Sequence, residues 1–193
     1  MSPVRRGSAV SLLNRLISLS YRRTSALAIW TDPAGSVRIR RAGEEDARAI
    51  SIYLAGSVGR TVDGFADSVE SAIRKGDFCV CLAMFGNWIV GYCSISRAGV
   101  DGWCLGNVRV HEALRRRGIG EGLVRHALDD ARKAERTPVF VNIDHDNVPS
   151  LSLFRKVGFR PAANEDAARK IEEHRRRSKG TSKRQIVMLI DPD

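Results

Sequence analysis

Three arginines followed by two spaced glycines, from Arg115 to Gly120, constrain this chain more than any other stretch. The apolar Val108 and Val110 before this run predict a strand, and the apolar spacing after Gly118 predicts a helix. Glycine lets an anion approach the main chain closely, and the free N–H groups of a first helical turn can then bind it. The stretch therefore predicts a strand-to-helix turn that binds a phosphate or pyrophosphate.

Spacing excludes two common phosphate-binding loops. A Walker loop continues with Lys-Ser/Thr after its last glycine, whereas Gly120 is followed here by Glu121 and Gly122. A dinucleotide fingerprint needs three spaced glycines at the first strand-to-helix turn, and only Gly118 and Gly120 fit that pattern. Taken alone, the motif also fits a surface turn with a solvated arginine cluster.

A second motif lies further along the chain. Residues 139–143 predict a buried strand, and Asn147 precedes a helix that ends at Gly158. Together, segments 108–124 and 147–159 resemble the two signature motifs of the GNAT superfamily of acetyl-CoA-dependent N-acetyltransferases, and the resemblance covers about residues 36–160. It implies a mixed α/β (α+β) fold of the GNAT acyltransferase type. The expected sheet is mixed and mostly antiparallel, with splayed fourth and fifth strands and helices on both faces.

The resemblance also implies an activity. A GNAT N-acetyltransferase moves an acetyl group from acetyl-CoA, its co-substrate, to a primary amine, which attacks the thioester directly through a tetrahedral intermediate. The acceptor is either a small molecule or a protein amine, and the motifs do not identify it. The alternative is a non-catalytic acyl-CoA-binding sensor or interaction module with the same fold.

The resemblance assigns the cofactor site to the strand, the glycine turn and the second motif. The residues assigned are Val108, Arg109, Val110, Arg115, Arg116, Arg117, Gly118, Ile119, Gly120, Asn147, Ser150 and Phe154. The turn backbone binds the pyrophosphate, and the arginines add phosphate contacts. A bulge in the preceding strand exposes a backbone N–H near Val110, which holds the thioester carbonyl and stabilises the oxyanion.

Two positions depart from the family pattern. Phe154 stands where the family often has a tyrosine that protonates the leaving thiolate, and Cys104 stands where a glutamate base is common. Substitute base candidates, acting directly or through water, are Glu70, Asp101, Asp144 and His145. The loss of the acid is tolerable, because general acid catalysis contributes only about 10²–10⁴-fold.

The chain divides into a basic extension, residues 1–35, and an acetyltransferase domain, residues 36–193, with a charged helical insertion at about 164–184. The extension contains no acid before Asp32, so we expect either an extra helix or an organellar transit peptide. The insertion either covers the acceptor site or binds a partner, or it is a solvated elaboration.

Composition adds limits. The four cysteines show no C-x-x-C spacing and no nearby histidine, so we expect reduced core thiols and no metal site. Reduced thiols favour a cytoplasmic protein, unless the extension targets an organelle. The net charge of +10 lies mostly outside residues 36–159, and no nucleic-acid-binding module is recognisable, so we do not expect nucleic-acid binding. No apolar run is long enough to span a membrane. The sequence does not decide between a monomer and a homodimer.

Overall fold

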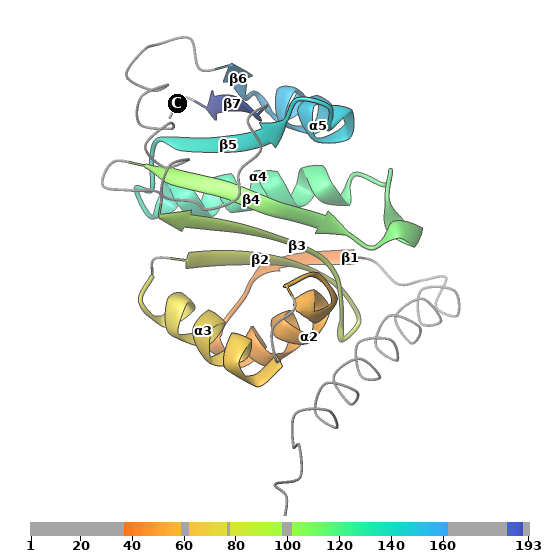
Figure 1. Ribbon diagram of the computed structural model, residues 1–193, viewed down its shortest axis with the longest axis vertical. Helices are drawn as coiled ribbons and strands as arrows, with labels where there is room; N and C mark the ends of the chain where they lie inside the picture. Colours follow the sequence, from red (N-terminus) through yellow and green to blue (C-terminus); the bar gives the residue numbers. More distant parts are fainter. Residues whose placement is uncertain (1–36, 59–61, 77, 98–101, 162–184, 191–193) are drawn as a thin grey trace, which may run out of the picture.

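The computed structural model describes residues 37–58, 62–76, 78–97, 102–161 and 185–190. These residues form one mixed sheet with helices on both faces, which confirms the predicted fold class (Figure 1). The extension, and the insertion up to residue 184, lie outside the described residues, so the predicted domain boundaries stay a prediction. Among the described residues, no helix is both long and apolar enough to cross a membrane.

Seven strands make up the sheet, in the order β1-β2-β3-β4-β5-β7-β6. They are β1 (Val37–Arg41), β2 (Phe78–Phe85), β3 (Trp88–Arg97), β4 (Trp103–Val110), β5 (Val139–Asp144), β6 (Arg160–Pro161) and β7 (Gln185–Ile190). All neighbouring strands are antiparallel except β4 and β5, which are parallel. β2 and β3 form an antiparallel hairpin, and Gly86 occupies its turn at φ +56°.

The helices cover both faces of this sheet (Figure 1). They are α2 (Ala47–Val58), α3 (Val62–Arg74), α4 (Ile119–Lys133) and α5 (Val148–Val157), with short 3-10 turns η1 (Glu44–Asp46) and η2 (Glu112–Leu114). One face packs against α2 and α3, and the other against α4 and α5. Both faces are therefore buried.

Alternate side chains of β2 pack into the hydrophobic cores on opposite faces of the sheet. Cys79 and Cys81 face the α4 side, whereas Val80 and Leu82 face the α2/α3 side, and all four are buried. On β3, a Cβ at Gly91 would lie only 3.1 Å from Leu123 Cδ1 of α4. The absence of a side chain at Gly91 thus lets α4 lie close to the sheet, and the position of its N-terminus depends on this packing.

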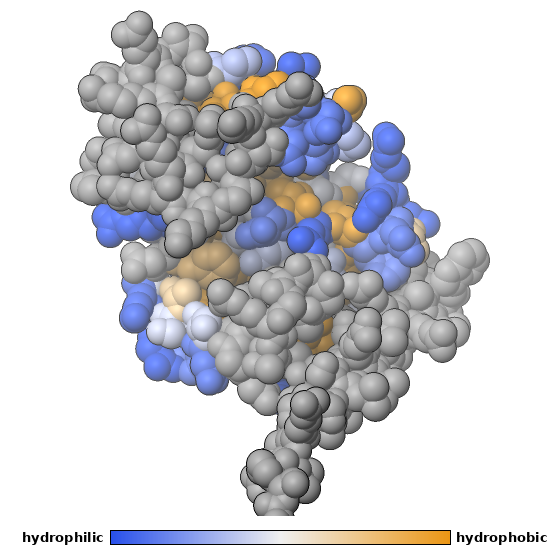
Figure 2. Space-filling view, viewed as in Figure 1, coloured by the Kyte–Doolittle hydropathy of each residue, from blue (hydrophilic) through white to orange (hydrophobic). Residues whose placement is uncertain are grey.

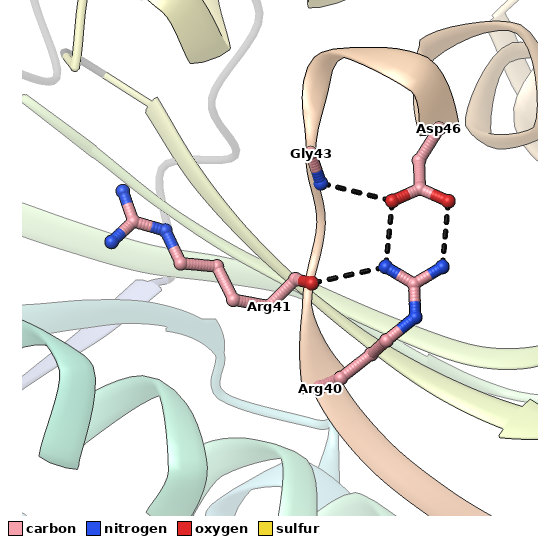
Figure 3. A network of polar contacts seen from close by, with 4 residues as sticks. All are labelled: Arg40, Arg41, Gly43 and Asp46. Atoms are coloured by element: carbon pink, nitrogen blue, oxygen red, sulfur yellow. Dashed lines mark hydrogen bonds and ion pairs between the residues drawn. The ribbon is translucent and has the colours of Figure 1, made fainter.

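The turn between β1 and α2 is fixed by one carboxylate (Figure 3). Asp46 accepts two hydrogen bonds of 2.7 Å from the Arg40 guanidinium and one of 2.9 Å from the Gly43 N–H. The Arg40 hydrogen bonds, helped by the one from Gly43, hold the pKa of Asp46 below its ordinary value despite its partial burial. Asp46 thus forms a bidentate ion pair that ties the end of β1 to the start of α2.

Candidate active site

The sheet is split between β4 and β5. These strands pair only at Trp103 with Val139 and at Cys104 with Phe140, and no strand among the described residues pairs with the rest of β4 on that edge. The expected splaying of the fourth and fifth strands is confirmed. At the closed end, the Trp103 ring lies 4.8 Å from the Arg136 guanidinium, a cation–π contact. Figure 2 shows hydrophobic surface between hydrophilic patches in the middle of the molecule, where β4 runs in Figure 1.

A bulge interrupts β4 on its other edge. Tyr92 pairs with Arg109 and Ser94 with Gly106, so β4 advances three residues while β3 advances two. The extra residue falls at Asn107, whose φ is +55° and whose Nδ2 donates to Ser94 Oγ at 3.1 Å. The predicted bulge in this strand is present, and it lies immediately before Val108.

The bulge and the split leave a backbone donor exposed. The His111 N–H donates to the Val90 carbonyl of β3 at 2.8 Å. Because successive N–H groups of a strand point to opposite edges, the Val110 N–H points away from β3, toward the edge that β5 leaves unpaired. The Val110 carbonyl lies on the same edge and accepts a 3.2 Å hydrogen bond from Arg115 Nε.

The glycine turn follows directly. Gly118 is the N-cap of α4 with φ +78°, a left-handed conformation that glycine adopts without strain, and it has no side chain to cap the helix. Arg115, Arg116 and Arg117 are exposed. Since no side-chain cap occupies them, the first N–H groups of α4 are available to an anion, as expected from the motif.

Gly120 lies where three elements meet. A Cβ at this position would lie 3.7 Å from Leu153 Cδ2 of α5 and 3.8 Å and 4.0 Å from the methyl groups of Val110 and Val108. These are ordinary contact distances, so alanine would fit here. The first turn of α4 thus lies against an apolar wall formed by the end of β4 and by α5.

One acid sits beside this cationic turn. Glu121 is bound by Lys156 of α5 at 2.6 Å and by Arg125 at 3.1 Å. The hydrogen bond from Lys156, then the one from Arg125, lowers the pKa of Glu121. Sequence reasoning missed this pair: the i,i+4 spacing predicts Arg125, but nothing in the sequence places Lys156 of another helix beside Glu121.

The comparison with known protein families decides the assignment. The family described as the acetyltransferase (GNAT) family matches residues 57–159, more than half of the chain. The chain belongs to the GNAT acetyltransferase family. Acetyl-CoA is the acyl donor of this family. No curated protein sequence matches the chain at a significant level.

Solved GNAT structures share the fold. A putative acetyltransferase, yncA from Salmonella typhimurium with acetyl-CoA, is 20% identical with a TM-score of 0.60, covering 81% of this chain and 94% of that one. A ribosomal-protein-alanine N-acetyltransferase from Brucella melitensis is 21% identical with a TM-score of 0.60, covering 79% and 98%. AAC(6')-Iy with a CoA bisubstrate analogue is 15% identical with a TM-score of 0.58, covering 67% and 94%.

The second GNAT motif serves largely to build α5. Asn147 caps this helix, because its Oδ1 accepts the Ser150 N–H at 3.2 Å. Phe154 is only 4% exposed and packs edge-on against Phe159, with ring centroids 5.2 Å apart. Phe154, which stands where the family often has a tyrosine, is therefore an aromatic side chain of the core.

The base candidates fall into three groups. Asp144 and His145 are exposed at the carboxyl end of β5. Because β4 is parallel to β5, its carboxyl end at Val110 lies at the same end of the sheet (Figure 1). Glu70 lies on α3 and is ion-paired with Arg74. Asp101 lies outside the described residues. Asp144 and His145 thus lie at the end of the sheet where the glycine turn begins, whereas Glu70 lies on α3 in an ion pair with Arg74.

His111 was not singled out from the sequence. It follows Val110 directly and caps η2, where its Nδ1 accepts the Ala113 N–H at 3.3 Å. This hydrogen bond requires an unprotonated Nδ1 and leaves Nε2 as the ring's other functional nitrogen. In the sequence, only its position directly after the predicted strand pointed to this site.

Proposed function

We propose that this protein is an N-acetyltransferase that transfers the acetyl group of acetyl-CoA to a primary amine by direct attack. The observation that carries the proposal is that a free strand edge and a helix N-terminus lie close together in the chain. The unpaired edge of β4 carries the Val110 N–H, and the uncapped N-terminus of α4 begins at Gly118, eight residues later. One site can therefore bind a pyrophosphate and polarise a carbonyl.

The residues present fit the acyl donor. The N–H groups of Ile119 and Gly120 are in the first turn of α4 and would hold the pyrophosphate with the positive end of the helix dipole. Arg116 and Arg117 are exposed beside them and would add charge-assisted contacts. The apolar wall of Val108, Val110 and Leu153 would line the arm that leads to the thioester.

The chemistry follows from these groups. As the amine nitrogen attacks the thioester carbon, a C–N bond forms and negative charge develops on the carbonyl oxygen. The Val110 N–H would donate to that oxygen, and a single donor of this kind is worth about 10²–10³-fold in rate. The C–S bond then breaks, and the thiolate leaves and takes its proton from water.

The amine must lose a proton before it attacks. Asp144 and His145 are exposed at the edge where β4 and β5 diverge, so either would accept this proton directly or through water. Phe154 has no proton to give, and its burial against Phe159 leaves leaving-group protonation to solvent. Most of the rate enhancement would then come from positioning and from the oxyanion donor.

The second candidate is a non-catalytic acyl-CoA-binding module. Two observations favour it: Phe154 is a buried core ring, and Cys104, where a glutamate base is common, is a half-buried thiol whose pKa burial raises to about 11. Neither group can act as an acid or base near neutral pH. A binding module would use the same glycine turn and the same Val110 edge.

One experiment separates the two candidates. Isothermal titration measures acetyl-CoA binding, and chromatographic assay of released CoA measures turnover with aminoglycosides, polyamines, amino acids and peptides with free N-termini. Binding with amine-dependent CoA release supports the enzyme. Binding without release for every amine class supports the module, and the absence of acetyl-CoA binding refutes both.

A further inference from the structure

Two thiols and a carboxylate converge in the core, at the end of α4 opposite the glycine turn. They are Cys79 and Cys81 of β2 and Asp130 of α4, and their ligand atoms all lie within 4.8 Å of one another. The sequence predicts thiols without a metal site, because the cysteines show no C-x-x-C spacing and no nearby histidine. Only the packing of α4 on β2 brings the three side chains together.

The geometry of β2 explains the convergence. Alternate residues of a strand point to the same face, so Cys79 and Cys81 both face α4, where they are 3% and 0% exposed. On α4, Ala127 and Ala131 are buried against the sheet, and Asp130 lies half-buried at the flank of that face. The carboxylate thus reaches the thiols from the rim of the core.

One oxygen of Asp130 lacks a partner. Within the part of the chain that the structure describes, its Oδ2 atom is buried and accepts no hydrogen bond. An unsatisfied buried carboxylate oxygen is costly, and the cost is removed by a proton or by a cation.

We propose that Cys79, Cys81 and Asp130 bind one thiophilic divalent cation of the Zn²⁺ class. Zn²⁺ takes cysteine sulfur and carboxylate oxygen in tetrahedral sites, and three protein ligands leave a fourth position for water. Binding breaks two S–H bonds and forms two metal–sulfur bonds, and both protons leave to solvent. The neighbouring Cys93 is engaged differently, because its Sγ donates to the Leu123 carbonyl at 3.4 Å.

The charges around the cluster suit this ligand set. A dication with two thiolates and one carboxylate carries a net charge of −1. Arg41 is opposite Cys81 in the β1–β2 register, so it lies on the same face of the sheet as the thiols. Figure 3 shows its side chain directed away from Arg40 and Asp46. Arg41 therefore offsets the negative charge of the occupied site.

The position assigns the ion a structural role. It would join β2 to the last turns of α4, whereas the proposed acetyl-CoA site lies at the first turn of the same helix. Binding to the folded state alone raises the unfolding temperature by mass action. The proposal is independent of the proposed function, since it requires neither acetyl-CoA binding nor turnover.

The test uses the full chain, stripped with a chelator under reducing conditions and titrated with Co²⁺. We expect one ion per chain, sulfur-to-metal charge-transfer absorption in the near ultraviolet, release of two protons, and displacement by Zn²⁺. Zn²⁺ at about 100 times its Kd raises the unfolding temperature by several degrees. A chain that shows neither this absorption nor a temperature shift with either metal overturns the proposal.

Three variants sharpen the result. Cys81→Ser and Asp130→Asn should each weaken Co²⁺ binding at least tenfold, whereas Cys104→Ser, a thiol outside this cluster, should bind as the parent does. Asp130→Asn is half-buried and keeps the side-chain shape, so it tests the site even if Cys81→Ser fails to fold, which circular dichroism reveals. Unchanged affinity in Asp130→Asn, or lost affinity in Cys104→Ser, contradicts the assignment.

Discussion

Replacing Gly118 by valine tests the glycine turn most directly. Gly118 has φ +78°, and a Cβ there would meet nothing within 4 Å, so the substitution clashes with no neighbour. The cost is in the backbone: a β-branched residue held at positive φ is strained by about 1–3 kcal/mol. For a chain of this size, each 1 kcal/mol lowers the unfolding temperature by about 2–4 °C.

The same strain reports on the anion site. Relief of the strain requires Gly118→Val to leave the left-handed region, which rotates the first N–H groups of α4 away from the pyrophosphate. We therefore expect a modest loss of stability and at least a tenfold rise in the Kd for acetyl-CoA. Thermal unfolding measures the first effect, and isothermal titration measures the second.

Gly120→Ala is the matched control, two residues along the chain. Its Cβ would make ordinary contacts at 3.7–4.0 Å, and alanine in place of glycine stabilises a helix by up to about 1 kcal/mol. Affinity for acetyl-CoA should be retained, in line with the family motif, which accepts alanine at this position. A Gly118→Val variant that binds acetyl-CoA within threefold of the parent would refute the assignment of the turn.

Three further predictions follow from single residues. Asp46→Asn should lower the free energy of unfolding by about 1.5–3 kcal/mol near neutral pH. Because the pKa of Asp46 in the folded state lies below its ordinary value of 3.8, this loss should disappear as the pH falls through the folded-state pKa. Acid unfolding measures the difference, and a difference that persists at the lowest pH would contradict the prediction. Glu121→Gln removes a negative charge beside the first turn of α4, so it should tighten acetyl-CoA binding a few-fold at low salt and less at high salt; weaker binding would count against the placement of the pyrophosphate there. Phe154→Tyr restores the hydroxyl that the family often has, so kcat should rise, by at most about 10²–10⁴-fold, and an unchanged kcat would show that leaving-group protonation does not limit turnover.

Local patterns predicted the scaffold of the site well. The glycine turn and the helix after Asn147 each depend on residues adjacent in the chain, so periodicity and turn chemistry are sufficient to predict them. The bulge at Asn107 was expected only through the family resemblance. Nothing in the composition of that strand marks an unpaired residue.

Contacts between distant elements were beyond the sequence. Lys156 reaches Glu121 only because α5 packs beside α4. The approach of Asp130 to the cysteines of β2 likewise depends on how a helix crosses a sheet. These relations are set by packing, which a local pattern of residue types does not encode.

The split in the sheet has a consequence for amide hydrogen exchange. The His111 amide is bonded to Val90 of β3, whereas the Val110 amide points to the edge that β5 does not pair. In the free protein, adjacent residues of one strand should therefore exchange at very different rates, slowly at His111 and rapidly at Val110. A ligand that fills the split should slow exchange at Val110 and leave His111 unchanged, so one pair of neighbouring amides would report occupancy of the site without any knowledge of the acceptor.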